Sequence, residues 1–464
     1  MKKWYNELIK NQGVKKMKKI ICILTSFCLM FGIFTIPATA EAKDPFDISP
    51  SEFVEQIGAG WNLGNTFENN WATYNSVYAQ ETALHGAETT KEMIDLVADT
   101  GFNAVRIPVS WGPQTTKNSK GKYVVKTELL KRVQTVADWC LARNMFVVIN
   151  MHHDDRKWLN ISATGNAWEE VKKQYRDTWE QVATYFRNYD EKLILEGGNE
   201  ILATCDFDGC KVGKTDYCWW GHSQLPFDKQ NELYQIFVDT VRATGGNNDR
   251  RFLMLPTYGA QWYGNQLGKL LIPNNDKHII VDIHWYEISN QMNIEGKVKP
   301  FAKDWIKYSQ AKGFGVVFGE CGFYDNVEYS TKVNWANTFV NTVRGTYKIP
   351  VFLWDDGGDM RIMNRRAVAW TTNGAPYVEA VIENSRKYIA RPDGKPVITW
   401  VLGDANNNEK FDSIDVVYLR KQLIKSLKTE FNPGADANAD GKVDVADLLK
   451  MRRVLARLET FDYN

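Results

Sequence analysis

Eight short apolar runs, spread over most of the chain, constrain the fold more than any other feature of this sequence. Each is four to six residues long and lacks polar alternation, as expected for strands buried on both faces. Amphipathic helical patterns separate most of them, for example over residues 89–100, 126–143, 168–188 and 228–244. The predicted strands cover residues 60–63, 104–109, 146–151, 193–196, 252–256, 279–283, 315–319 and 350–354. Eight such βα units predict an α/β fold, a (β/α)8 TIM barrel over residues 45–390.

Another fold and two classes of partner fit the sequence less well. A doubly wound open sheet would also alternate strands and helices, but no G-x-G-x-x-G turn follows the first predicted strand. Lys and Arg number 57 and Asp and Glu 56, so the formal net charge is +1. Such a chain has no electrostatic bias toward nucleic acid or anionic membranes. We therefore expect a barrel that binds neither of them.

The N-terminus has the pattern of a secretory signal. Lysines at positions 15, 16, 18 and 19 precede an apolar run of about 17 residues, and Ala38 and Ala40 form an A-x-A cleavage pattern. A membrane anchor is the alternative, but the run is near the lower length limit for spanning a bilayer. We expect residues 1–40 to be removed and the mature protein to be secreted.

Five cysteines remain after that cleavage. An odd number does not make a disulfide framework. Cys205, Cys210 and Cys218 crowd one predicted loop, where a single bridge would suit a secreted protein. Cys140 lies in a helical pattern and Cys321 beside an apolar strand, so both are expected to be small buried hydrophobes.

A duplicated segment follows a predicted linker over residues 391–399. Within residues 400–464 a loop rich in Asp and Asn occurs twice, and each copy leads into a helical pattern. Calcium takes about six to eight oxygen ligands, which loops of this kind supply from alternating positions. The expected ligands are Asp404, Asn406, Asn408, Lys410 and Asp415 in the first copy, and Asp436, Asn438, Asp440, Lys442 and Asp447 in the second.

This pair of EF-hand-like loop–helix segments resembles a dockerin, a small all-α module. The resemblance implies two structural calcium ions and, as partner, a cohesin domain on a scaffold protein. A pair of polar turns that bind no metal is the alternative.

Two glutamates follow predicted strands at the end of a barrel where active sites lie. Glu200 follows the fourth apolar run and Glu320 follows the seventh directly. Glycoside hydrolysis requires two carboxyl groups that flank the scissile bond. One protonates the leaving oxygen and, in retaining enzymes, the other attacks the anomeric carbon. These glutamates are therefore the candidate catalytic pair, with Glu200 expected to have a raised pKa so that it starts protonated.

Other polar and aromatic side chains are predicted at the same mouth of the barrel. They are Arg106, His152, His153, Asn199, His284, Tyr286 and Trp354. A zinc site is the alternative reading of the histidines. It is disfavoured for His152 and His153, because neighbours on a strand point to opposite faces.

The sequence over residues 50–385 resembles glycoside hydrolase family 5, especially subfamily 4. The motifs G-W-N-L-G-N-T (60–66), G-F-N-A-V-R-I-P-V-S-W (101–111), I-N-M-H-H-D (149–154), N-E (199–200), I-H-W-Y (283–286), G-E (319–320) and L-W-D (353–355) carry the resemblance. It implies that Glu200 is the acid/base and Glu320 the nucleophile. It also implies that Arg106 and Tyr286 hold Glu320, and that Asn199 binds the sugar 2-hydroxyl.

The resemblance further implies that His152 and His284 support the carboxylates and sugar hydroxyls, and that Trp354 stacks under the sugar ring before the bond. The predicted protein is a retaining endo-β-1,4-glucanase that needs no cofactor for catalysis. Related specificities are xyloglucanase, xylanase, mixed-linkage glucanase and mannanase. An alternative from another class of protein also remains: a catalytically inactive glycan-binding scaffold component.

Overall fold

The computed structural model describes most of the chain. It covers residues 44–210, 216–219, 221–263, 266, 268–286, 293–386, 403–406, 411–424, 433–438, 442–456 and 458. The predicted signal peptide, the predicted linker and the candidate ligands Asn408, Lys410 and Asp440 lie outside the described residues. Within the described ranges, no helix combines the length and apolarity needed to cross a bilayer.

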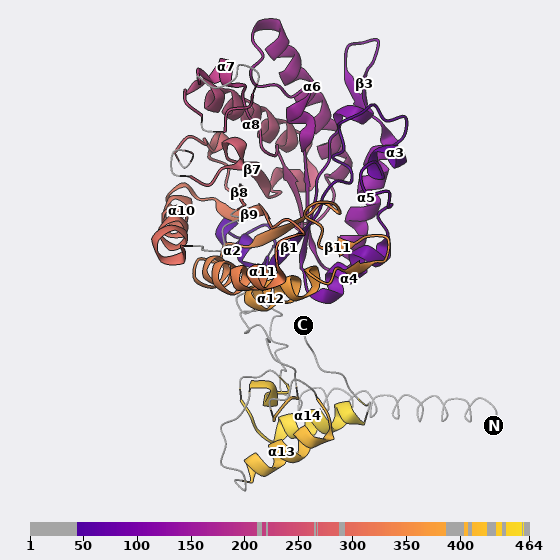
Figure 1. Ribbon diagram of the computed structural model, residues 1–464, viewed down its shortest axis with the longest axis vertical. Helices are drawn as coiled ribbons and strands as arrows, with labels where there is room; N and C mark the ends of the chain where they lie inside the picture. The colour runs from indigo at the N-terminus through magenta and orange to yellow at the C-terminus, as the bar shows by residue number, and fades with distance from the viewer. Residues whose placement is uncertain are drawn as a thin grey trace, which may run out of the picture. The chain divides into compact units, whose positions relative to one another are not determined.

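Eight parallel strands close into a barrel surrounded by helices (Figure 1), which confirms the predicted TIM barrel. The strands are β1 (Ala59–Leu63), β2 (Ala104–Ile107), β5 (Phe146–Asn150), β6 (Leu193–Glu196), β7 (Leu253–Pro256), β8 (Ile279–Trp285), β9 (Gly315–Cys321) and β10 (Val351–Asp355). Each strand pairs with its neighbours in the chain order of these eight, and β10 closes the barrel on β1. The short apolar runs of the sequence are therefore strands buried on both faces.

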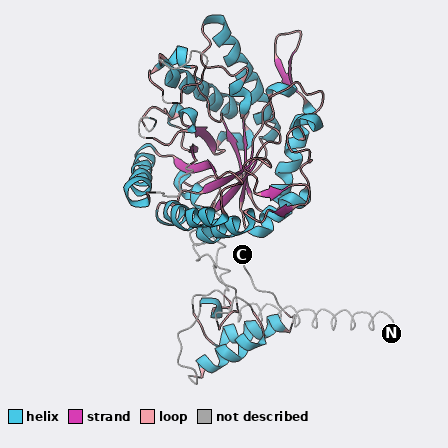
Figure 2. Cartoon of the chain, viewed as in Figure 1, coloured by secondary structure: helices cyan, strands magenta, loops and turns pink. Residues whose placement is uncertain are grey.

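Amphipathic helices cover the outside of the barrel (Figure 2). The main ones are α4 (Lys91–Thr100), α5 (Thr127–Ala142), α6 (Gly165–Phe186), α8 (Leu225–Ala243), α10 (Lys299–Lys312), α11 (Tyr329–Trp335) with the π-helix η7 (Ala336–Thr346), and α12 (Gly374–Arg386). In α4, the Thr90 side chain caps the start by accepting from the Met93 N–H. The helix ends at Gly101, whose φ of 112° is one that residues with a Cβ rarely adopt.

The interior of the barrel changes from apolar to polar along the strands. At the N-terminal ends an apolar cluster fills it, and α2 (Pro50–Glu55) contributes Phe53 and Val54 to this cluster. Side chains two residues apart in a strand point to the same face of the sheet, which here is the interior of the barrel. In this way Ala104 is followed by Arg106, Ile194 by Glu196, and Ile280 by Asp282. The C-terminal half of the barrel is therefore lined with buried polar groups.

The strand ends differ from the prediction in two places that matter for the site. The seventh strand was expected to end at Gly319, but β9 continues to Cys321, so Glu320 lies within the strand. The sixth strand was expected to end at Ile283, but β8 continues to Trp285. A register shift after Ile283 pairs His284 with Glu320. Two hairpins outside the barrel, β3 (Thr115–Lys117) with β4 (Tyr123–Val125) and β11 (Met363–Asn364) with β12 (Ala369–Trp370), were not predicted.

The C-terminal segment forms a small unit of two helices, as the sequence predicted. Helix α13 (Ser413–Leu423) and helix α14 (Val445–Leu455) follow the first and second loop copies. Asp412 and Asp444 cap these helices in the same way, each with an Asp three residues later. The core of this two-helix unit is small and includes Leu419 and Met451, which are both fully buried.

Candidate active site

The two candidate glutamates face each other across the C-terminal mouth of the barrel. Glu320 lies in β9, and Glu200 lies four residues beyond the end of β6. One carboxylate oxygen from each, together with a ring nitrogen of His284, lie within 4.8 Å of one another. The Glu320 side chain is 6% exposed and that of Glu200 is 19% exposed, so both have access to a ligand in the cleft.

Arg106 fixes one side of Glu320. Its Nη1 donates to Glu320 Oε1 at 2.7 Å, and its Nε and Nη2 donate to the two oxygens of Glu196 at 2.7 and 2.9 Å. Nη2 also donates to Asn199 Oδ1 at 2.8 Å. On the other side, the Tyr286 hydroxyl donates to Glu320 Oε2 at 2.7 Å. Both oxygens of Glu320 are therefore held by charged or phenolic donors.

His284 links Glu200 to a buried carboxylate behind it. Its Nδ1 lies 2.9 Å from Glu200 Oε1, and its Nε2 lies 3.1 Å from Asp282 Oδ2. Asp282 Oδ1 in turn accepts the Gly319 N–H at 2.7 Å. A Cβ at Gly319 would lie 2.2 Å from that oxygen, so the close approach requires glycine. This chain of contacts fixes the imidazole between two carboxylates.

The pKa of Glu200 is shifted in the direction opposite to the one expected from the sequence. Burial acts to raise the pKa of Glu200, but the hydrogen bond and charge of His284 lower it below its ordinary value. Burial acts to lower the pKa of His284, but Glu320 and Asp282 hold it well above the ordinary value. The expected raised pKa of Glu200 was therefore wrong for the substrate-free protein. The cause of the lowered pKa is His284, a histidine from another strand, whose own pKa is raised.

The pKa of Glu320 is shifted in the opposite direction to that of Glu200. Burial raises the pKa of this carboxyl above its ordinary value, against the opposing charges of His284 and Arg106. Without those two cations the carboxyl would be still harder to ionise.

His152, His153 and Trp354 complete one wall. The rings of His152 and Trp354 stack with centroids 5.5 Å apart and an interplanar angle of 4°. The rings of His152 and His153 lie 4.4 Å apart, so the argument that they point to opposite faces was wrong. The reason is that β5 ends at Asn150 and strand alternation stops there. Burial lowers the pKa of His153 to about 4 and holds the pKa of His152 well below its ordinary value, which favours the neutral form of both rings.

Comparison with known families bears on this arrangement. A family model described as cellulase (glycosyl hydrolase family 5) matches residues 63–359, well over half of the chain. The chain belongs to glycosyl hydrolase family 5. A second model, the dockerin type I domain, matches residues 402–456. This family 5 enzyme therefore carries a C-terminal type I dockerin.

Individual relatives agree with the family. The chain is 30% identical to the cellulase/esterase CelE of Acetivibrio thermocellus, over 89% of this chain and 54% of that protein. It thus spans about half the length of that relative. It is 28% identical to endoglucanase B of Clostridium cellulovorans, over 88% of this chain and 91% of that one. A broad-specificity GH5-4 endoglucanase from Ruminococcus champanellensis, solved with bound cellotriose, superposes with a TM-score of 0.64 at 30% identity, covering 72% of this chain and 99% of that one.

Three site residues of the family 5 enzyme escaped the sequence analysis. Glu196 and Asp282 are fully buried and hold Arg106 and His284. The period of two in the strands could have found them, because Ile194 and Ile280 face the same interior. The third, Arg156, places Nη2 3.7 Å from Glu200 Oε2. It lies at the end of η2 (His153–Arg156), a 3-10 helix after β5 that is too short to show periodicity in the sequence.

The dockerin loops fit calcium in the parts that the structure describes. Asp415 Oδ1 accepts the N–H groups of Ala405 and Asn406, and Asp447 Oδ1 accepts that of Asn438. Each last acidic residue of a loop is therefore folded back onto the loop's start, as a calcium loop requires. Both of these Asp side chains are fully buried, as charges rarely are without a counter-ion.

Proposed function

We propose that this family 5 enzyme is a secreted endo-β-1,4-glucanase that acts by double displacement with retention of configuration. The separation of Glu200 and Glu320 carries the proposal. Retaining pairs of carboxyl groups lie about 5–5.5 Å apart, whereas inverting pairs lie about 6.5–9.5 Å apart to admit a water molecule. Oxygens of these two residues lie within 4.8 Å of each other, which supports the retaining arrangement.

In this proposal Glu320 is the nucleophile. Arg106 and Tyr286 hold its two oxygens, so one carboxylate oxygen is kept in position to attack the anomeric carbon. Asn199, aligned by Arg106, would bind the 2-hydroxyl of the sugar at the bond. Trp354 would form the platform under the sugar ring before the bond, next to His152 and His153.

Glu200 is the acid/base of the proposed reaction. It must deliver a proton to the leaving oxygen, and then remove one from the attacking water. The hydrogen bond between His284 and Glu200 would supply this proton, since both ring nitrogens of His284 face carboxylate oxygens and its pKa is held well above the ordinary value. Transfer along this bond would make Glu200 the acid when a sugar replaces the water around it.

Replacing His284 with Asn is expected to lower kcat by about 10²–10³-fold and to move the acid limb of kcat/KM to higher pH. Burial already raises the pKa of Glu320, and His284 is the first of the charges that oppose it. Without the imidazole, more Glu320 is protonated at a given acidic pH, and a protonated nucleophile does not attack. The pH profile of kcat/KM on an aryl cellobioside measures this. His278→Asn, at the residue just before β8 begins, is the control. An unmoved acid limb in His284→Asn would contradict the assignment.

The substrate class rests on the relatives, among them endoglucanases and a broad-specificity enzyme that was solved with cellotriose. Release of reducing sugar from carboxymethylcellulose, mixed-linkage β-glucan, xyloglucan, xylan and glucomannan tests it. We expect fast release from the β-1,4-glucans. Activity confined to xylan or glucomannan would leave the proposed mechanism intact but would show that the proposed substrate is wrong. If folded protein releases no reducing sugar from any of the five polysaccharides, the alternative of a catalytically inactive glycan-binding component is favoured.

The dockerin is proposed to bind a cohesin domain and thereby to place the enzyme in a cellulosome. The proposed domain limits are residues 1–40 for the signal peptide, 45–390 for the barrel, 391–399 for the linker and 400–464 for the dockerin. Calcium, proposed as two ions, would be held by the Asp and Asn side chains of the two loops and would stabilise the dockerin fold.

Removal of calcium is expected to abolish cohesin binding and to leave hydrolysis unchanged. The loops supply oxygen ligands, whereas the barrel chemistry needs only carboxylates and donors. Titration calorimetry with a cohesin, and glucanase assays in calcium and in EGTA, measure both properties. The double variant Asp415→Ala, Asp447→Ala should reproduce the loss of binding in saturating calcium. Loss of hydrolysis together with binding would instead indicate that a metal acts at the barrel.

A further inference from the structure

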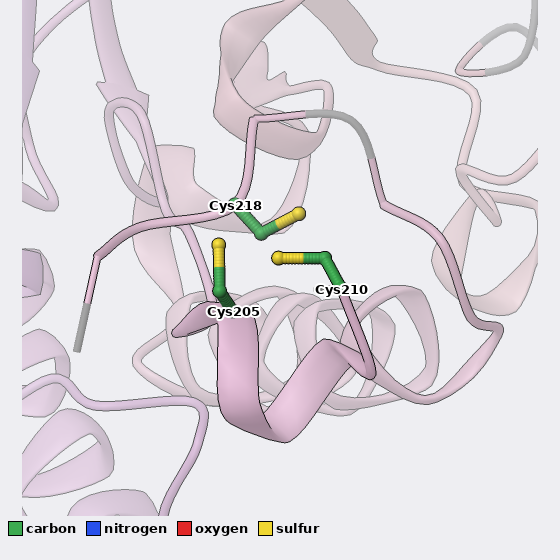
Figure 3. Close-up of side chains that lie close together, drawn as sticks. All are labelled: Cys205, Cys210 and Cys218. Atoms are coloured by element: carbon green, nitrogen blue, oxygen red, sulfur yellow. The ribbon is translucent and has the colours of Figure 1, made fainter. Parts of the chain in front are cut away.

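Three cysteine side chains meet in the loop between β6 and α8, outside the chemistry described above. The side chains of Cys205, Cys210 and Cys218 lie close together (Figure 3), and all three sulfurs lie within 4.8 Å of one another. No disulfide joins them, so the single bridge considered from the sequence is not formed. Cys205 and Cys218 are buried and Cys210 is half-buried, whereas Cys140 and Cys321 are isolated buried thiols as expected.

The backbone holds these thiols in place. The Cys205 N–H donates to the Asp216 carbonyl at 2.7 Å, and the Cys218 N–H donates to the Ala203 carbonyl at 2.8 Å. The two segments thus run antiparallel and bring Cys205 beside Cys218. The Cys210 N–H donates to the Cys205 carbonyl at 3.0 Å, which turns the third cysteine back onto the other two. The convergence therefore follows from the main chain and needs no covalent bond.

We propose that Cys205, Cys210 and Cys218 form a binding site for a soft divalent metal ion such as Zn²⁺. A disulfide would use two sulfurs and leave the third without a role, whereas a metal takes all three. Zinc–thiolate bonds of about 2.3 Å put the sulfurs of a tetrahedral site about 3.8 Å apart. Sulfurs within 4.8 Å of one another reach that spacing with small side-chain movements. Thiolates also favour zinc over the calcium that the dockerin is expected to bind.

The fourth ligand would be water or another small molecule. In the described part of the chain, no fourth His, Cys, Asp or Glu belongs to this group of ligand atoms. The Asp208 side chain contacts that of Cys218, but its two oxygens already accept the N–H groups of His222 and Ser223 and the Ser223 hydroxyl. Three protein ligands with water in the fourth position are known from catalytic zinc sites, whereas most structural zinc sites have four protein ligands.

The bound metal would stiffen a wall of the proposed active site. The same loop carries Tyr217 and Trp219, and the Arg156 guanidinium lies 4.6 Å and 5.7 Å from the centres of their rings. Arg156 is also the cation beside Glu200. The metal is thus expected to act on the position of this loop, and not on the chemical step.

Metal analysis of the full mature chain tests the proposal. Protein purified under reducing conditions is equilibrated with Zn²⁺, desalted into calcium buffer and analysed by mass spectrometry for metals. We expect about one zinc per chain, reduced at least about tenfold in Cys210→Ser, and unchanged in Cys140→Ser. Cobalt in place of zinc should give thiolate-to-metal charge-transfer absorption that Cys210→Ser lacks. Cys210 is chosen because it is half-buried, and circular dichroism checks that the variant folds.

Two results would overturn the proposal. One is equal zinc content in the wild-type protein and folded Cys210→Ser. The other is a disulfide between two of the three cysteines, found by peptide mapping of the protein as secreted, together with absence of zinc.

Discussion

Replacing Glu320 with Gln is expected to lower kcat by on the order of 10⁴-fold or more, while cellotetraose still binds. The amide keeps the shape of the carboxyl group but cannot form the glycosyl–enzyme bond. It still accepts one hydrogen bond from Arg106 or Tyr286, so the cleft should keep its form. Initial rates on mixed-linkage β-glucan and calorimetric titration with cellotetraose measure the two properties.

A matched control and a chemical rescue sharpen this experiment. Glu180→Gln changes the same atoms at an exposed position, where the side chain pairs with Lys122 at 2.7 Å, and should keep full activity. In Glu320→Ala, azide is small enough to enter in place of the carboxylate. It should turn an aryl β-cellobioside into the α-glycosyl azide. Full turnover by Glu320→Gln would show that another group is the nucleophile.

Replacing Arg106 with Met is expected to destabilise the barrel by about 3–5 kcal/mol, the largest stability effect that we predict for one substitution. Arg106 is fully buried and donates to Glu196, Glu320 and Asn199. Its removal leaves Glu196 and Glu320 buried without this cation, with only the charge of His284 nearby, and they must either remain charged at high cost or take up protons. Denaturant unfolding in saturating calcium, followed by tryptophan fluorescence, measures the change.

The control for this variant is Arg361→Met. That side chain is 45% exposed and its ion pair with Asp325, at 2.9 Å, is solvated, so the loss should stay below about 1 kcal/mol. Because Arg106 opposes the upward shift in the pKa of Glu320, any remaining activity in Arg106→Met should have its acid limb at higher pH. Equal stability of the two variants would contradict the view that Arg106 neutralises two buried carboxylates.

Sequence patterns predicted the barrel because every apolar run is a strand buried on both faces. They also predicted the residues at the strand ends, since the carboxyl ends of parallel strands meet at one mouth. Glu196 and Asp282 were missed although the period of two places them on the interior face of their strands, because the partners of an isolated charge in an apolar run are not visible in the sequence. The misjudged pKa of Glu200 has the same origin, since its cause is His284, which lies 84 residues away in the chain.

The loop after β6 shows a second limit. Its three cysteines could be recognised as crowded in the sequence. Their convergence depends on backbone hydrogen bonds between residues 203–205 and 216–218, which no periodicity predicts. The hairpins β3–β4 and β11–β12 were missed for a similar reason, because strands of two or three residues are too short for alternation to be seen.

The anomeric configuration of the first product tests the central claim most directly. Proton NMR of cellohexaose or mixed-linkage β-glucan, recorded in the first minutes after the enzyme is added, separates the α and β hemiacetals before they interconvert. Double displacement through Glu320 predicts that the β anomer forms first and that the α anomer grows in later by mutarotation. If the α anomer forms first, the two glutamates activate a water molecule in a single displacement, and the proposed mechanism is wrong.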